Sequence, residues 1–266
     1  MIDLHCHLLP GIDDGPPDLE GTLALARSLV ESGLHTVAAT PHIDDAWGVE
    51  PLEVSARVAV VQSALDESGI ALRVVPGGEI SLSRMVELAG EQVDAVRLGG
   101  GPYVLLESPL IAAAGSFDRV VGTLRERGEP IVLAHPERAP LFQREPERLA
   151  ELVEAGVLTS LTAGALTGRF GRTVRASALD MLRHGLVHTI SSDAHDAVRR
   201  PPELRAGLRA AAEEEPWVLG HADWLTRAMP EAVLAGTSLP AAPARPALHA
   251  KGPEHRWWRR SQSSEW

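Results

Sequence analysis

The chain has 266 residues, of which 44% are apolar, and a formal net charge of −11. This length suits one large domain or two small ones with a sizeable core, and the acidic balance argues against nucleic acid as the main partner. No run of eighteen apolar residues is present that would span a membrane. The first residues form no basic or apolar signal-peptide region, so we expect a cytoplasmic location.

Short apolar runs alternate with amphipathic helices from the N-terminus to about Gly185. Seven strands are expected, at residues 1–5, 36–42, 72–80, 103–109, 130–138, 157–164 and 187–195. Helices are expected at residues 18–32, 51–68, 84–89, 117–127, 146–154, 174–184, 203–214 and 216–234. Strands that alternate with helices indicate an α/β fold with a parallel sheet or barrel, and seven strands favour a barrel.

The chain changes character after Pro240. Residues 241–266 contain five Lys or Arg against two Glu, begin rich in alanine and proline, and end polar. We therefore expect a barrel domain at residues 1–240 and a disordered basic tail at 241–266. The HRWWRR cluster of this tail is of a kind that contacts a membrane surface or an acidic partner, although a solvated tail without such a role is the simpler interpretation.

Imidazole or carboxylate side chains follow six of the seven expected strands. They are His5 and His7, His42, Glu79, Glu107, His135, and Asp193 with His195. In a parallel barrel the carboxyl ends of all strands open onto one face, where active sites lie. One histidine at a strand end is usually structural, but this recurrence predicts a shared site.

The spacing of two pairs supports this interpretation. Side chains two apart in a strand share a face, so His5 and His7 point the same way. Asp193 and His195 repeat this spacing at the last strand. The first and last strands of a closed barrel are neighbours, so the two pairs are expected to meet.

A carboxylate on the loop after the first strand completes the donor set. Asp13 and Asp14 both stand there, and the residues alone favour Asp14 moderately. The set then holds five histidines and four carboxylates, more than one catalytic metal needs, so two or three divalent ions are expected. Without thiolates, such donors suit Mn²⁺, Fe or Zn²⁺. Clustered ions can generate a bridging hydroxide for in-line attack on phosphorus, so the expected reaction is phosphoester hydrolysis.

The single cysteine, Cys6, excludes an internal disulfide. It also excludes a cysteine-dependent phosphatase, because such an enzyme needs an arginine six positions after the nucleophile and Ile12 stands there. We interpret Cys6 as a small, buried apolar residue.

Arginines follow two of the predicted ligands. Arg138 comes after His135, and the pair Arg199 and Arg200 comes after His195. A guanidinium fork matches the oxygens of a phosphate group. These positions favour a substrate-binding role for Arg138 and Arg200.

Seven segments carry a family resemblance, in family order and over about residues 1–220. They read DLHCHLLPGIDDG, ATPH, GGEI, LLESP, LAHPER, LTAGALTGRFG and SSDAHDAVRRPP. With them the chain resembles the polymerase-and-histidinol-phosphatase (PHP) superfamily, and more closely its CpsB/CapC branch of capsular-polysaccharide tyrosine phosphatases. The resemblance implies a distorted (β/α)7 barrel that holds three divalent metal ions, with Mn²⁺ expected and Fe or Zn²⁺ as alternatives.

The resemblance also implies a ligand for each metal. The first metal would take His5, His7, Glu79 and Asp193. Glu79 would bridge to the second metal, which would also take Glu107 and His135. The third metal would take Asp14, His42 and His195, so the resemblance selects Asp14 over Asp13. Arg138 and Arg200 match the phosphate-binding arginines of the branch.

The activity implied is that of a protein-tyrosine phosphatase acting on a phosphotyrosyl protein, such as a bacterial tyrosine kinase or an exopolysaccharide regulator. One alternative is a PHP phosphatase of a small phosphomonoester, such as histidinol phosphate or a nucleotide. A second alternative is a catalytically weak metal-binding regulator, against which the complete ligand set argues. Aromatic residues for stacking on a phenol ring are scarce, and Trp47 is the one candidate.

Overall fold

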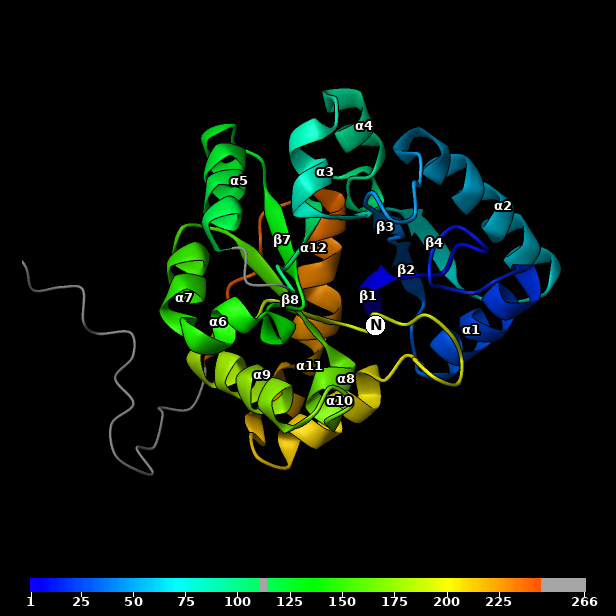
Figure 1. Cartoon of the computed structure of the whole chain (residues 1–266). Helices are drawn as coiled ribbons and strands as arrows, with labels where there is room; N and C mark the ends of the chain where they lie inside the picture. The colour runs from blue at the N-terminus through cyan, green and yellow to red at the C-terminus, as the bar shows by residue number, and fades with distance from the viewer. Residues whose placement is uncertain (111–113, 245–266) are drawn as a thin grey trace, which may run out of the picture.

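The computed structural model describes residues 1–110 and 114–244. Parallel strands form the centre and helices surround them (Figure 1). The strands of the described part are β1 (Ile2–Cys6), β2 (Thr36–Ala39), β3 (His42–Ile43), β4 (Arg73–Pro76), β5 (Glu79–Ile80), β6 (Val104–Glu107), β7 (Ile131–Ala134), β8 (Leu158–Thr162) and β9 (Thr189–Ser191).

These strands close into a barrel with seven strand positions. One sheet has the order β1-β2-β4 and the other the order β3-β5-β6-β7-β8-β9, and β3 and β5 continue the positions of β2 and β4. The ring closes where Cys6 of β1 pairs with Ala194 after β9. There the His7 N–H donates to the Ala194 carbonyl at 2.9 Å, and the Asp193 N–H donates to the His5 carbonyl at 2.8 Å. The predicted (β/α)7 barrel is confirmed, and its distortion lies in the two divided strands.

The second and third predicted strands are divided for local reasons. Pro41 has no N–H for the strand ladder, so the second strand stops and resumes at His42. Gly78 separates β4 from β5, and a Cβ atom there would come within 2.8 Å of the Ile43 side chain. After each break the strand begins again with a predicted ligand. His42 is the first residue of β3, Glu79 is the first residue of β5, and the two residues pair in parallel register.

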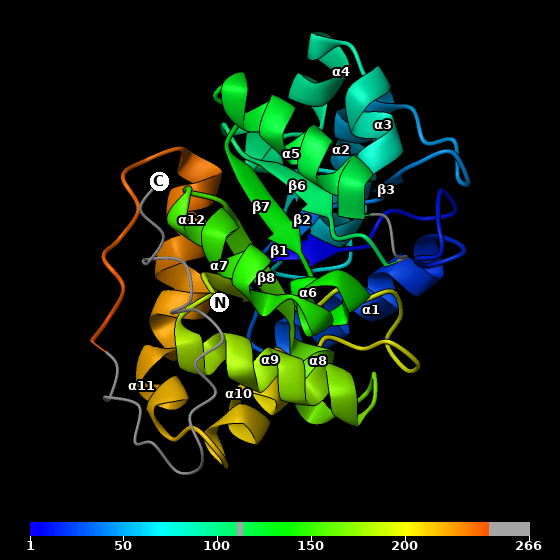
Figure 2. The same cartoon turned by 60° about the vertical axis from the view of Figure 1, so that its left-hand side comes forward.

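Helices cover the outside of the barrel (Figures 1 and 2). In the described part they are α1 (Leu19–Glu31), α2 (Val54–Glu67), α3 (Leu82–Glu87), α4 (Gly90–Ala95), α5 (Ala114–Glu126), α6 (Pro140–Arg144), α7 (Pro146–Glu154), α8 (Ala163–Thr167), α9 (Arg172–His184), α10 (Leu204–Ala212), α11 (Trp217–Asp223) and α12 (Met229–Ala235). The first of them is capped by Asp18, whose carboxylate accepts the Gly21 N–H at 2.9 Å.

The predicted helices are confirmed to within a few residues, and three short helices were not predicted. Two of these, α4 and α6, have six and five residues, too few to show a helical period. The third, α8, replaces the end of the strand predicted at 157–164, which stops at Thr162. Gly207 of α10 lies so close to Ala163 that a Cβ atom would sit 2.7 Å from the Ala163 carbonyl oxygen. The small residues of α8 therefore allow α8 and α10 to pack closely. Because this contact joins two distant segments, the sequence of one segment alone does not reveal it.

The barrel is sealed at its amino-terminal end. Met229 and Val233 of α12 pack in one buried cluster with Ile2, Leu4 and Leu158 at the strands. A second, larger cluster fills the space between the strands and the outer helices. Because one end of the barrel is filled with apolar side chains, polar side chains gather at the other end, where the strands finish.

The end of the described chain lies against the domain. Trp224 Nε1 donates to the Pro240 carbonyl at 3.2 Å, and Ala242 and Pro243 line a small hollow with Trp217. Of the predicted tail, residues 245–266 lie outside the described residues. No helix within 1–110 and 114–244 has the length and apolarity needed to cross a membrane.

Candidate metal centre

The two ligand pairs from opposite ends of the chain meet at the carboxyl end of the barrel. His5 lies in β1 and His7 directly after it, beside the loop that carries Asp193 and His195. His5 Nε2 and His7 Nε2 each lie 3.6 Å from Asp193 Oδ1. The rings of His7 and His195 are stacked, with centroids 3.9 Å apart. Closure of the barrel between β1 and β9 therefore brings the two ligand pairs together, as their spacing in the sequence predicts.

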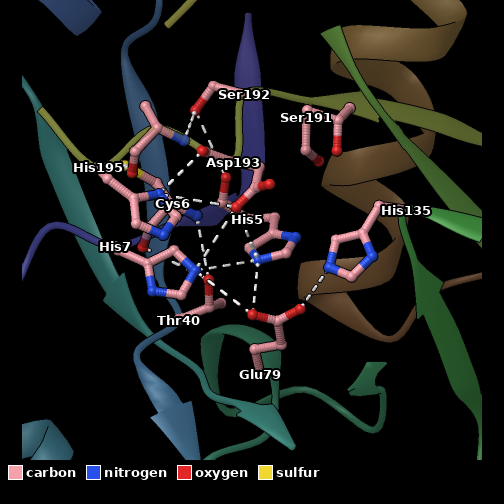
Figure 3. Close-up of polar contacts among 12 residues, drawn as sticks. His5, Cys6, His7, Thr40, Glu79, His135, Ser191, Ser192, Asp193 and His195 are labelled. Atoms are coloured by element: carbon pink, nitrogen blue, oxygen red, sulfur yellow. Dashed lines mark hydrogen bonds and ion pairs between the residues drawn. The ribbon is translucent and has the colours of Figure 1, made fainter. Parts of the chain in front are cut away.

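Glu79 lies at the centre of this group, with both carboxylate oxygens turned towards imidazoles (Figure 3). Its Oε1 lies 2.7 Å from His135 Nε2. Its Oε2 lies 3.2 Å from His5 Nε2 and 3.4 Å from His7 Nε2, and His42 Nδ1 approaches the same oxygen at 3.2 Å. Burial opposes ionisation of this carboxyl, but the charges of His5 and His135 outweigh it and hold the Glu79 pKa well below its usual range. A carboxylate in this position is suited to bridge two ions.

Asp14 gathers a second group of imidazoles. Its Oδ1 lies 3.1 Å from His195 Nε2 and 3.4 Å from His42 Nε2. The Asp14 side chain is 39% exposed, so this part of the site reaches solvent. Burial opposes its ionisation, but the neighbouring imidazoles of His195 and His42 outweigh that effect and lower the Asp14 pKa.

Asp13 has a different position from its neighbour. Its Oδ2 lies 2.8 Å from His7 Nδ1 and accepts the His42 N–H at 3.1 Å, while its Oδ1 accepts the Gly15 N–H at 2.9 Å. Asp13 thus contacts Nδ1 of His7, and the other ring nitrogen of His7, Nε2, faces the centre of the ligand group. Carboxylates that bind the far nitrogen of a histidine orient it as a metal ligand. The loop therefore gives the two aspartates separate positions, Asp14 at the centre and Asp13 behind it.

Glu107, the last residue of β6, lies at the edge of the centre. Burial and the nearby charge of Glu79 together raise the pKa of Glu107 to about 7. Glu79 pairs with Leu105 of β6, and Glu107 follows Leu105 by two residues on the same strand. The two carboxyl groups therefore come from adjacent strands of the barrel.

Three overlapping groups of side chains have ligand atoms within 4.8 Å of one another. They are His7, Asp14, His42 and His195; His5, His7 and Asp193; and His5, Glu79 and His135. His42 Nδ1 and His195 Nε2 are buried and make no well-formed hydrogen bond within the described part of the chain, although carboxylate oxygens lie 3.2 and 3.1 Å away. Buried imidazole nitrogens beside carboxylates, without a thiolate, fit divalent ions such as Mn²⁺, Fe²⁺ or Zn²⁺.

Backbone strain is concentrated at two of the predicted ligands. Of the non-glycine residues that the structure describes, only His135 and Asp193 have positive φ, at 34° and 50°. Such conformations cost free energy and persist where the surrounding structure enforces them, which is often at functional sites. At these two strand ends the turn directs an imidazole and a carboxylate towards Glu79 and His5.

Arg138 and Arg200 converge on one carboxylate oxygen of the centre. Each places a guanidinium nitrogen 2.8 Å from Asp193 Oδ2. Arg200 also lies 3.6 Å from Asp14 Oδ2. Arg199 is exposed, and its backbone carbonyl accepts a hydrogen bond from Arg169. The two arginines favoured by the sequence therefore border the centre, whereas the Arg199 side chain is exposed.

Sequence reasoning missed two supporting residues. The Arg138 guanidinium lies over the Phe170 ring, 4.6 Å from its centroid. Asp3 is fully buried, and its Oδ1 accepts the N–H groups of His5 and Ser192 at 3.1 and 3.0 Å, which ties β1 to the loop after β9. Both belong to segments that resemble the family motifs, but only their neighbours were given roles.

Cys6 takes no part in this chemistry. It is free, fully buried, and 3.5 Å from the Ala194 carbonyl oxygen. Burial raises the pKa of its thiol well above the usual range, so the thiolate is disfavoured. The interpretation of Cys6 as a buried apolar residue is confirmed.

The fold and the site together define a parallel β/α barrel with a clustered histidine–carboxylate centre at the carboxyl ends of its strands. Residues 1–215 match the family described as capsular polysaccharide synthesis, CpsB/CapC, and the chain belongs to that family. The predicted family is therefore confirmed.

Named relatives and a solved structure agree with this assignment. The chain is 34% identical over 215 residues to the tyrosine-protein phosphatase YwqE of Bacillus subtilis, covering 80% of this chain and 85% of the relative. It is 25% identical over 222 residues to the tyrosine-protein phosphatase CpsB of Streptococcus pneumoniae, covering 80% and 90%. A crystal structure from work on these two proteins, described there as unique metal-dependent tyrosine phosphatases, matches with a TM-score of 0.78 and 29% identity, covering 94% of this chain and all of that one.

Proposed function

We propose that this protein is a metal-dependent protein-tyrosine phosphatase of the capsule and exopolysaccharide type. The observation that carries the proposal is the convergence of two arginines and a histidine–carboxylate cluster on one buried carboxylate, Asp193. Clustered divalent ions and guanidinium groups are the two devices that stabilise a transferring phosphoryl group. The relatives named above supply the substrate class, because they are named tyrosine-protein phosphatases.

The nine predicted ligands would hold three divalent ions, with Mn²⁺ as the expected metal and Fe or Zn²⁺ as alternatives. The proposed sets are His5, His7, Glu79 and Asp193; Glu79, Glu107 and His135; and Asp14, His42 and His195. Eight of these residues are supported by the close grouping of mixed nitrogen and oxygen donors. Glu107 lies outside these groups, and its support is the family resemblance and its position at the end of β6, the strand beside that of Glu79. When bound, such ions supply a nucleophile at neutral pH and neutralise charge on the phosphoryl oxygens.

Arg138 and Arg200 would bind and orient the phosphoryl group. A guanidinium has five N–H donors, so each arginine keeps donors for phosphoryl oxygens while it pairs with Asp193. The Phe170 ring fixes the plane of the Arg138 guanidinium. Fixed donors on the phosphoryl oxygens align phosphorus for in-line displacement without further reorganisation.

We expect Arg138→Ala or Arg200→Ala to lower kcat/KM for an aryl phosphate by roughly 10²–10³, as for the loss of one oxyanion donor. Metal content should stay the same, because a guanidinium cannot bind a cation. Lysine at either position should restore activity only in part, since a point charge lacks the bidentate fork. Steady-state kinetics with elemental analysis of each variant measures both effects.

Arg199→Ala is the matched control for these variants, and we expect a mild effect. The Arg199 side chain is exposed, and only its backbone is held by the loop. If Arg199→Ala lowers kcat/KM more than Arg200→Ala does, the phosphate-binding residue is Arg199 and not Arg200. If all three variants are mild, the metal ions alone hold the phosphate.

The substrate class is tested with three phosphomonoesters. We expect the Mn²⁺-loaded protein to turn over a phosphotyrosyl peptide with a higher kcat/KM than histidinol phosphate or a nucleoside monophosphate. A reversed order would show a small-molecule phosphatase on the same barrel. Negligible turnover of all three, with metal bound, would show a metal-binding regulator and contradict the proposal.

The natural partner would be a phosphotyrosyl protein, such as a bacterial tyrosine kinase, in the cytoplasm. The free thiol of Cys6 is in keeping with that compartment. Immunoblotting of fractionated cells, with and without the gene, would test both points. An extracytoplasmic location, or unchanged phosphotyrosine levels, would contradict them.

We propose that the catalytic domain ends near residue 240 and that the basic tail serves contacts with a membrane surface or an acidic partner. Every proposed ligand lies before that point. Deleting residues 245–266 is therefore expected to leave hydrolysis of an aryl phosphate within about twofold of the full chain, because all the proposed ligands and both proposed phosphate-binding arginines remain. Sedimentation with anionic vesicles should be lost in the same variant. If the shortened protein unfolds, the tail belongs to the barrel.

A further inference from the structure

A groove lies between α3 and α5, next to the metal centre. Two views show these helices side by side (Figures 1 and 2). The groove has a volume of about 420 Å³, which is in the range of ligand-binding pockets. Its lining includes Leu82 and Val86 of α3, Val120 of α5, and Pro109 after β6. The walls therefore combine apolar side chains with serines and two charged residues, Glu107 and Arg119.

Glu107 lies at the junction of the groove and the centre. This residue ends β6, lines the groove, and is close enough to Glu79 for the two charges to interact. The arginines proposed for phosphate instead pair with Asp193 after β9. A phosphate ester held by those arginines leaves the rest of its polypeptide to run past Glu107 into the groove.

The groove exposes apolar surface to solvent. The Val86 side chain is 63% exposed and Leu110, also on the lining, is 40% exposed. Exposed aliphatic side chains beside a functional site are typical of a surface that binds a partner. The groove adjoins, through Glu107, a site whose proposed substrate is a protein.

The groove is lined by one guanidinium, that of Arg119, as well as by the carboxyl group of Glu107. Arg119 of α5 lines it and is exposed, and no ion-pair partner for its guanidinium is found in residues 1–110 or 114–244. Other arginines nearby are paired, since Arg148 contacts Asp118 and Arg84 contacts Glu87. In a chain with a net charge of −11, a free guanidinium at an apolar groove favours a carboxylate on the bound segment.

We propose that the α3–α5 groove binds the polypeptide segment that adjoins the phosphotyrosine, with an aliphatic side chain between the helices and an acidic side chain on Arg119. This inference rests on the proposed tyrosine phosphatase function and adds a sequence preference to it. Val86 and Arg119 are then specificity-determining residues that lie outside the metal centre.

The charge part is tested with three phosphotyrosyl peptides that differ only in having Glu, Gln or Lys beside the phosphotyrosine. For the Mn²⁺-loaded wild type we expect kcat/KM to fall in the order Glu, Gln, Lys. In Arg119→Glu the ratio of the Glu peptide to the Lys peptide should fall by on the order of tenfold, because an attraction becomes a repulsion. Arg125→Glu is the matched control, since Arg125 lies exposed on the same helix but does not line the groove.

The apolar part is tested with Val86→Ser and a peptide carrying Leu or Ser beside the phosphotyrosine. The preference for the Leu peptide should drop by roughly threefold to tenfold in this variant, as for the loss of one buried aliphatic contact. Val60→Ser is the matched control, because Val60 lies on α2, is 65% exposed and is not part of the groove.

Two kinds of failure can be told apart. If wild type cleaves an aryl phosphate and all peptides, but the peptide ratios are the same in Arg119→Glu, Val86→Ser and their controls, the groove does not read the substrate and the inference is overturned. If metal-loaded wild type cleaves neither aryl phosphate nor peptide, the proposed function itself fails, and the inference with it.

Discussion

Stripping the protein with EDTA is expected to abolish hydrolysis of a chromogenic aryl phosphate almost completely, and adding Mn²⁺ is expected to restore it. The physical reason is that a water activated by the ions is the nucleophile of the proposed chemistry. The thiol of Cys6 is buried with a raised pKa, and the carboxylates at the centre are surrounded by imidazoles or arginines. Without ions, water at the centre is not activated at neutral pH.

The measurement combines activity with metal analysis on the same samples. Turnover should follow metal content through stripping and reloading with Mn²⁺, Fe²⁺ or Zn²⁺, and the metal that gives the highest turnover per bound ion identifies the effective cofactor. Circular dichroism of the stripped protein checks that the barrel remains folded. Undiminished activity in a sample free of metal would contradict the proposed chemistry.

Glu79→Ala is expected to lower activity by on the order of 10³ or more, and more than Glu107→Ala does. Both oxygens of Glu79 lie among imidazoles from three strand ends, so its removal disturbs every ligand group that it contacts. Glu107 lies at the edge, near one carboxylate, and serves one ion in the proposed ligand sets. A bridging carboxylate positions two ions, whereas a terminal ligand positions one.

Metal content separates these two roles directly. Elemental analysis should show a larger loss of bound metal per chain in Glu79→Ala than in Glu107→Ala, and titration with Mn²⁺ should show more of the lost sites refilled in the Glu107 variant. Equal occupancy in the two variants would contradict the bridging role of Glu79. A Glu107→Ala variant that folds but binds no metal would show that metal binding depends on Glu107 more than on Glu79.

The local sequence determined the order of strands and helices, because hydrophobic period, glycine stops and capping act over a few residues. The helix at Pro146–Glu154 has the predicted bounds, and β7 lies within its predicted run. Candidate ligands could also be named, since parallel strands end on the same face and an imidazole or carboxylate follows six of the seven expected strands. Family resemblance then separated Asp14 from Asp13 without giving a physical reason.

The tertiary structure supplies that reason and determines how the side chains of the site lie relative to one another. The path of one loop places Asp14 at the centre and Asp13 behind His7, a choice that two identical side chains in adjacent positions do not encode locally. The stacking of Arg138 on Phe170 joins segments that are distant in sequence. The groove likewise depends on the packing of α3 against α5, two helices that precede and follow β6 in the chain. Such features arise from the packing of remote segments, so the chemical groups could be named from the sequence alone, whereas their geometry required the fold.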